Sequence, residues 1–154
     1  MSSRQAEPSR RRGAAALPSV AVVEAGSVPG SRVTAALVRA AEAAGNTAPV
    51  VAVDARPATL TEAIVPEASW RQADPATPAV LDALRGVDAV VWVAASADLQ
   101  AALAQRASAR RARMVRTAQT LVTAAAAAGA HRLVVVTSAK VYGCLLYTSP
   151  SPRD

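Results

Sequence analysis

The sequence has little of several residue types, and each shortage excludes a class of protein. Cysteine occurs once, at Cys144, so an internal disulfide is impossible and a cysteine-based zinc site is not expected. No apolar run approaches the roughly 20 residues that span a bilayer. Aromatic residues make up 3% of the chain and Phe is absent, so platforms for stacking nucleic-acid bases are nearly missing. We therefore expect a cytoplasmic protein with no metal site, no membrane span and no nucleic-acid partner.

Lysine is also scarce, and arginine supplies nearly all of the positive charge behind the net charge of +6. The arginines gather in the N-terminal tail and in a predicted helix around residues 106–116. This distribution favours a basic tail and a solvated helix face. The alternative is a nucleic-acid-binding protein that uses the arginine helix, and it predicts strong, salt-dependent DNA binding.

Hydrophobic residues, mostly Ala and Val, make up 52% of the chain, which is enough to bury a core. Short β-branched runs alternate with helical patterns, which is typical of a parallel sheet joined by crossover helices. The sequence predicts an α/β fold, a Rossmann-type doubly wound parallel sheet that is incomplete at about five strands. The expected domain covers residues 18–143, after a disordered basic tail at residues 1–17. The expected strands are 19–23, 50–54, 69–72, 89–93 and 133–136, and the expected helices are 31–44, 79–85 and 99–128.

The turn after the first predicted strand contains Gly26 and Gly30, where a dinucleotide's pyrophosphate would meet backbone N–H groups and a helix N-terminus. Two glycines are a weak signal, and an ordinary tight turn fits them as well. Asp54 strengthens the case, because an acid at the end of the second strand can accept both hydroxyls of an adenosine ribose. A strand-end cap is the alternative for Asp54. Arg56 is close enough to hold a 2′-phosphate instead, so NAD is expected and NADP is possible.

Two longer segments resemble a known family. Residues 86–95 read GVDAVVWVAA, and residues 129–143 read GAHRLVVVTSAKVYG. In this order and spacing they resemble the extended short-chain dehydrogenase/reductases of the NAD-dependent epimerase/dehydratase type. The resemblance covers residues 19–143. It implies a hydride transfer between a nicotinamide and a nucleotide sugar or similar small substrate, and a possible homodimer in the parent protein.

The resemblance also implies roles for individual residues in cofactor binding. Gly30 matches the third glycine of the family's turn, and Asp54 matches the acid that binds the ribose. Asp74 matches a loop acid that reaches the adenine amino group. Ala94 and Ala95 match the small pair against which the cofactor lies.

Only one catalytic position has a match, because Ser138 corresponds to the residue that hydrogen-bonds the substrate's reacting oxygen. The family's Tyr-x-x-x-Lys pair is absent from the chain. Residues 144–154 do not continue the family pattern and resemble the in-frame translation of a transposase sequencing adapter. The sequence therefore predicts the truncated N-terminal part of such an enzyme, itself inactive, followed by an artefactual tail at residues 144–154.

The chain departs from the family at the phosphate-binding turn. Glu24 stands at the first glycine position, Ser27 stands at the second, and Trp92 replaces a usual His. A carboxylate repels a pyrophosphate, and a Ser Cβ crowds it. These departures favour the alternative of a non-catalytic Rossmann module, a sensor or scaffold that binds dinucleotides weakly or not at all.

Overall fold

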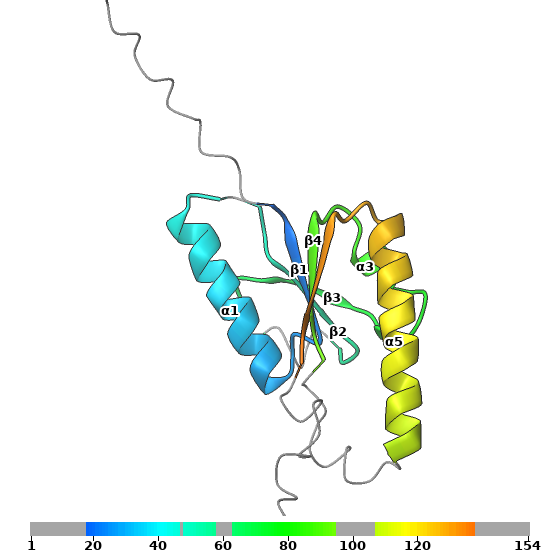
Figure 1. The fold of residues 1–154 in the computed structure, drawn as a ribbon. Helices are drawn as coiled ribbons and strands as arrows, with labels where there is room; N and C mark the ends of the chain where they lie inside the picture. Colours follow the sequence, from blue (N-terminus) through cyan, green and yellow to red (C-terminus); the bar gives the residue numbers. More distant parts are fainter. Residues whose placement is uncertain (1–17, 47, 58–62, 95–106, 138–154) are drawn as a thin grey trace, which may run out of the picture.

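The computed structural model describes residues 18–46, 48–57, 63–94 and 107–137 of the chain. These residues form a parallel sheet flanked by helices (Figure 1). The strands are β1 (Val20–Val23), β2 (Val51–Asp54), β3 (Ser69–Gln72), β4 (Ala89–Val93) and β5 (Arg132–Val136). The helices are α1 (Val28–Ala43), α3 (Val80–Ala83) and α5 (Ala107–Ala127).

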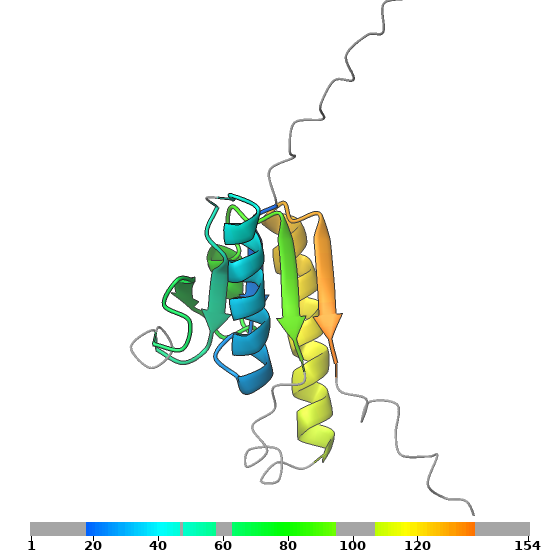
Figure 2. The same cartoon turned by 90° about the vertical axis from the view of Figure 1, so that its left-hand side faces the viewer.

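The five strands lie in the order β3-β2-β1-β4-β5, and each neighbouring pair is parallel. Their carboxyl ends therefore lie at one edge of the sheet, as the arrowheads of β2, β4 and β5 show in Figure 2. The strand order reverses next to β1, because the chain first adds β2 and β3 on one side and then β4 and β5 on the other. The crevice between the carboxyl ends of β1 and β4 is thus the topological switch point, where ligands bind in sheets of this kind.

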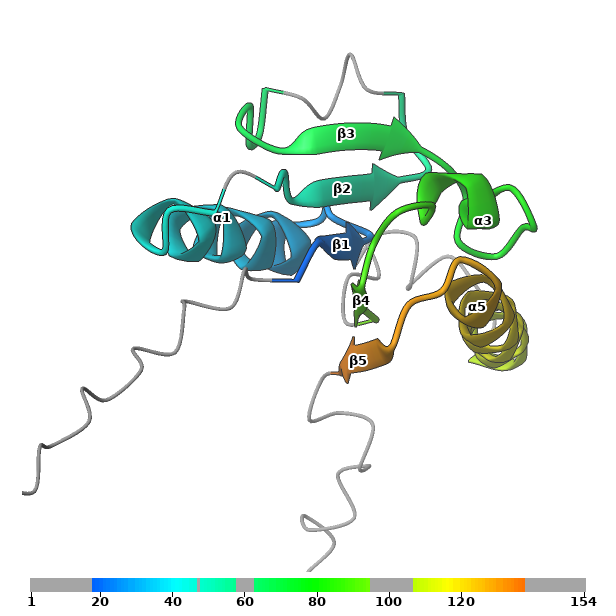
Figure 3. The ribbon, with the colours of Figure 1, turned by 90° about the horizontal axis from the view of Figure 1, so that it is seen from above.

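Alternate residues of β1 face opposite layers of the fold. Val22 packs in a core cluster with Val38 of α1, whereas Val23 packs in a second cluster with Leu84 and with Leu121 of α5. Helix α1 covers one face of the sheet and α3 and α5 cover the other (Figures 1 and 3). The doubly wound parallel sheet predicted from the sequence is confirmed, and its core consists mainly of Val and Ala.

Several boundaries differ from the sequence-based expectation. Helix α1 begins at Val28, three residues earlier than expected, because Ser27 caps it and a proline is tolerated in the first helical turn. Helix α3 covers only Val80–Ala83 of the expected 79–85. Residues 99–106 of the expected long helix lie outside the described residues, and α5 begins at Ala107.

In the described part of the chain, β5 pairs with β4 alone and forms one edge of the sheet. Its side chains are poorly covered, since Val134 and Val135 are 44% and 46% exposed. The other edge strand, β3, has a polar sequence. Among the described residues, no helix is both long and apolar enough to cross a membrane.

Candidate functional site: the carboxyl ends of β1, β2 and β4

The turn between β1 and α1 is held by the side chain of Ser27. Its Oγ donates to the carbonyl oxygen of Glu24 (2.8 Å) and accepts from the N–H of Gly30 (3.0 Å). Glu24 has φ of +63°, a left-handed conformation that costs a non-glycine residue about 1–3 kcal/mol. Glu24 stands at the first glycine position of the family turn, so the turn keeps a glycine-like conformation although the glycine is gone.

Gly30 lies in the first turn of α1 and is buried. A Cβ at this position would meet Ser27 Oγ at 2.7 Å, the Cα of Ala25 at 3.0 Å and, closer still, the carbonyl oxygen of Glu24. Two of these three contacts are backbone atoms, which cannot swing away. The glycine therefore lets α1 start directly against the end of β1, and its position supports the role expected for the third glycine.

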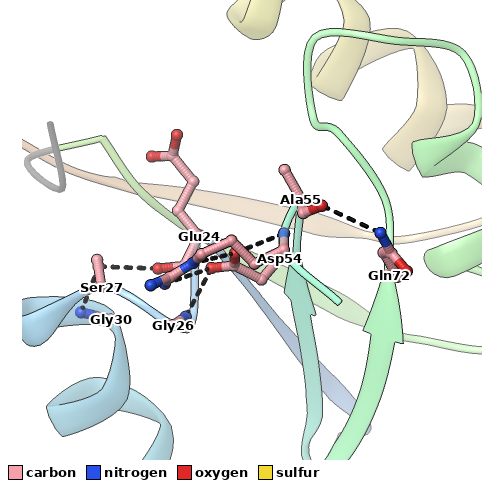
Figure 4. Close-up of polar contacts among 8 residues, drawn as sticks. Glu24, Gly26, Ser27, Gly30, Asp54, Ala55 and Gln72 are labelled. Carbon is pink, nitrogen blue, oxygen red and sulfur yellow. Dashed lines mark hydrogen bonds and ion pairs between the residues drawn. The ribbon is translucent and has the colours of Figure 1, made fainter. Parts of the chain in front are cut away.

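Asp54 ends β2 and lies beside this turn, with 7% of its surface exposed. Its Oδ2 accepts from the N–H of Gly26 (2.8 Å) and from Arg56 Nη2 (3.3 Å). Its Oδ1 accepts from the N–H (3.0 Å) and the Nε (2.9 Å) of Arg56. Figure 4 shows Asp54 between the turn and the neighbouring Gln72 of β3, whose Nε2 donates to the carbonyl oxygen of Ala55 (3.3 Å). The structure thus brings together three residues that the sequence analysis selected.

The surroundings of Asp54 favour its charged form. Burial alone raises the pKa of the carboxyl group, but the hydrogen bonds from the Arg56 side chain, from the Arg56 N–H and from the Gly26 N–H outweigh burial. The net effect is a pKa below the ordinary value for Asp. At neutral pH Asp54 is therefore a carboxylate, and the guanidinium of Arg56 balances its charge.

This pKa shift makes stability depend on pH. Because the pKa is lower in the folded state, Asp54 contributes stability above its unfolded pKa of about 3.9, and this contribution is lost as pH falls through the lowered value. We expect the free energy of unfolding, measured by urea titration between pH 6 and pH 3, to fall more steeply in the wild type than in Asp54→Asn. Parallel pH dependences for the two proteins would show that the Asp54 hydrogen bonds do not form. Asp82→Asn, which alters an exposed ion pair in α3, is the matched control.

Asp74, the expected adenine-binding acid, follows β3 and lies close to the end of β2, because the Ala73 N–H donates to the carbonyl oxygen of Asp54 (2.9 Å). Its Oδ1 accepts from the N–H of Ala76 (2.9 Å) and pairs with Arg113 Nη2 of α5 (3.2 Å). Sequence analysis did not anticipate the Arg113 contact, which ties α5 to this edge of the sheet. The adenine contact of Asp74 stays a prediction.

Trp92 and Glu24 meet across the switch point. Trp92 pairs in register with Val23, and its Nε1 donates to Glu24 Oε2 (3.3 Å) although the two residues are 68 positions apart. The Glu24 carboxylate points away from Asp54 (Figure 4). The sequence showed both residues as departures from the family, but nothing in the pattern indicated that they contact each other.

The remaining expected site residues are only partly described. Ala94 directly follows β4 and is buried, as a position against the strand end requires. Ala95 and Ser138 lie outside the described residues. Within the described ranges, no group of three or more His, Cys, Asp or Glu residues could hold a metal ion.

The fold and this edge of the sheet define a Rossmann-type nucleotide-binding domain. The switch-point crevice, the glycine turn at the start of α1 and the acid at the end of β2 are its parts. The chain belongs to the NAD(P)H-binding family, whose model matches residues 21–150.

Solved structures of related fold agree with this assignment. A dTDP-glucose 4,6-dehydratase from Streptomyces venezuelae, with NAD bound, is 28% identical with a TM-score of 0.58, over 74% of this chain and 37% of that chain. MoeE5, in complex with UDP-glucose and NAD, is 29% identical with a TM-score of 0.54, over 81% of this chain and 38% of that chain. An NADPH-dependent quinone oxidoreductase from Escherichia coli shares the fold at 23% identity and a TM-score of 0.53, over 75% of this chain and 35% of that chain.

The chain spans little more than a third of the length of these structures. No curated protein matches it. The matched part is the NAD(P)H-binding domain, which is related to that of the extended epimerases and dehydratases.

Proposed function

We propose that this chain is the cofactor-binding part of an NAD(P)-dependent epimerase, dehydratase or reductase that acts on a nucleotide sugar or similar small substrate. The family match supports cofactor binding, and two similar structures that hold NAD, one of them a dehydratase and the other bound to UDP-glucose, support the substrate class. The 154 residues contain no Tyr-x-x-x-Lys pair. We therefore propose that they have no turnover by themselves.

The observation that carries the proposal is the position of Asp54. It lies at the carboxyl end of β2, next to the N–H of Gly26 and to the first turn of α1. An adenosine ribose at this edge would find a charged acceptor for its hydroxyls. The nicotinamide, when bound, would supply the hydride chemistry. We also propose that Asp74 contacts the adenine, that the cofactor lies against the small side chains of Ala94 and Ala95, and that Ser138 contacts the substrate.

The cofactor type depends on Arg56. The two oxygens of a carboxylate accept about four hydrogen bonds, and Asp54 already accepts four, three of them from Arg56. A ribose 2′- and 3′-diol therefore needs the Arg56 side chain to move. That side chain is 50% exposed. We propose NAD as the cofactor, with NADP accepted when Arg56 turns to a 2′-phosphate.

Arg56→Ala tests this arrangement. We expect the ratio of NADH to NADPH affinity to rise at least about tenfold, because a charged hydrogen bond to a phosphate is worth about 1.5–3 kcal/mol and its loss also opens Asp54 to the ribose. Calorimetric titration of the 154-residue chain with each cofactor measures the ratio. The matched control is Arg85→Ala. Arg85 follows α3 and forms an exposed ion pair with Asp82 of that helix.

An unchanged ratio in Arg56→Ala would contradict the role of Arg56. The absence of heat from wild type with either cofactor at millimolar concentration would instead favour the second candidate, a non-catalytic sensor or scaffold. The Glu24 and Ser27 side chains in the phosphate-binding turn are the observation that favours this candidate.

A further inference from the structure

The backbone donors of the β1–α1 turn are already used within the chain. The N–H groups of Gly26, Ser27 and Gly30 donate to Asp54 Oδ2 (2.8 Å), the Glu24 carbonyl oxygen (3.2 Å) and Ser27 Oγ (3.0 Å). Pro29, in the first turn of α1, has no N–H to offer. A phosphate group at this helix N-terminus would have to compete with the chain's own acceptors for nearly every donor.

A negative charge also stands in the crevice. Glu24 follows directly on β1, and its carboxylate is held toward β4 by the Trp92 indole (3.3 Å). These are the two strands between which the switch point lies, so the carboxylate lies at the edge of the sheet where ligands bind in folds of this kind. Trp92 is 5% exposed and packed in the core cluster beneath α5, so the hydrogen-bond donor that holds Glu24 is itself fixed.

The backbone of Glu24 is held in a strained conformation. A residue with φ of +63° that is not glycine is strained, and such strain often marks a functional position. Asp54 forms an ion pair with Arg56 and faces the other way (Figure 4). The turn thus combines an acceptor suited to an uncharged ribose at β2 with an anion at the position of the pyrophosphate.

We propose that Glu24 is a specificity-determining residue of this site, which lets the chain bind the adenosine end of its ligand while weakening the binding of the diphosphate. The proposal rests on the proposed function, because it takes the adenosine subsite at Asp54 as given. The negatively charged cofactor is then bound weakly, and the affinity for adenine nucleotides does not increase as phosphates are added to the 5′ position.

The experiment compares a ligand series on the full 154-residue chain by calorimetry. Adenosine, ADP and NADH are titrated into wild type, Glu24→Gln and the control Glu42→Gln, which removes the same charge from an exposed site near the end of α1. Gln keeps an oxygen that can accept from the Trp92 indole, so the substitution removes the charge and leaves the contact.

We expect wild type to bind ADP and NADH no more tightly than adenosine. In Glu24→Gln the Kd for ADP and NADH should fall about tenfold or more, because a like charge a few ångströms from a phosphate is removed, while the Kd for adenosine changes less than about twofold. Glu42→Gln should behave as wild type. A loss of structure in Glu24→Gln would change all three ligands together, and the wild-type series alone still tests the proposal.

Wild type that binds ADP at least about tenfold more tightly than adenosine would overturn the proposal, as would equal gains for all three ligands in Glu24→Gln. In both cases the proposed function would stand, because adenosine and NADH would bind. If no ligand bound to either protein at millimolar concentration, the proposed function itself would fail, and the inference about Glu24 would fail with it.

Discussion

Gly30→Ala is expected to lower the free energy of unfolding by about 3 kcal/mol. The added Cβ would overlap the carbonyl oxygen of Glu24 and approach Ser27 Oγ to 2.7 Å. Relief requires moving α1 away from β1, because the Glu24 oxygen belongs to the backbone. The same shift would break the Ser27 cap, which by itself is worth about 0.5–2 kcal/mol.

The measurement is urea unfolding followed by far-ultraviolet circular dichroism, with Ser31→Ala as the matched control. Ser31 is the next residue in the first turn of α1 and is partly exposed, and among the described residues its hydroxyl bonds only to the Val28 carbonyl oxygen. Its replacement should change stability by less than about 0.5 kcal/mol. Equal stabilities of Gly30→Ala and Ser31→Ala would show that the turn does not pack against α1 as described.

Leu121→Ala is expected to cost about 2–5 kcal/mol. Leu121 of α5 is fully buried and joins Leu84 in the core cluster under that face of the sheet. Its neighbours are mostly Val and Ala, whose short side chains cannot extend to fill the space that the leucine leaves. The cavity should therefore stay largely open, which places the cost in the upper part of that range.

Val122→Ala is the control for the same helix, because Val122 is 56% exposed and Ala is the stronger helix former. Its free energy of unfolding should equal or slightly exceed that of wild type. If Leu121→Ala proved as stable as Val122→Ala, α5 would not be docked through Leu121 on the sheet. A changed slope of free energy against urea would indicate an altered unfolded state and would call for a comparison at the transition midpoint.

The fold could be predicted from the sequence because its signals are local. Val20–Val23 and Ala89–Val93 are short apolar runs of the kind that a sheet buried on both faces requires, and the structure pairs them directly. The predicted start of α1 is too late because Pro29 is typical of turns, although proline also suits the first helical positions.

The candidate site could be predicted only where neighbours in sequence meet. Asp54 and Arg56 are two residues apart, the sequence indicates both as candidates for cofactor binding, and the structure joins them in an ion pair. The contacts of Trp92 with Glu24 and of Arg113 with Asp74 join residues far apart in the chain, and they depend on side-chain reach across finished elements. No periodicity or spacing in the sequence encodes such long-range contacts. The sequence could therefore indicate individual residues, but not which of them contact each other.

The composition of the core has a consequence for the entropy of folding. Most of the buried apolar residues are Val and Ala, with Leu84, Trp92 and Leu121 as the large exceptions. Ala has no rotamers to lose, and Val is already restricted at χ1 by its branched Cβ, so ordering these side chains opposes folding less than ordering long ones would. The same stiffness leaves the packed layers few alternative rotamers. The crevice at the ends of β1 and β4 therefore rests on a core that has little freedom to rearrange when a ligand binds.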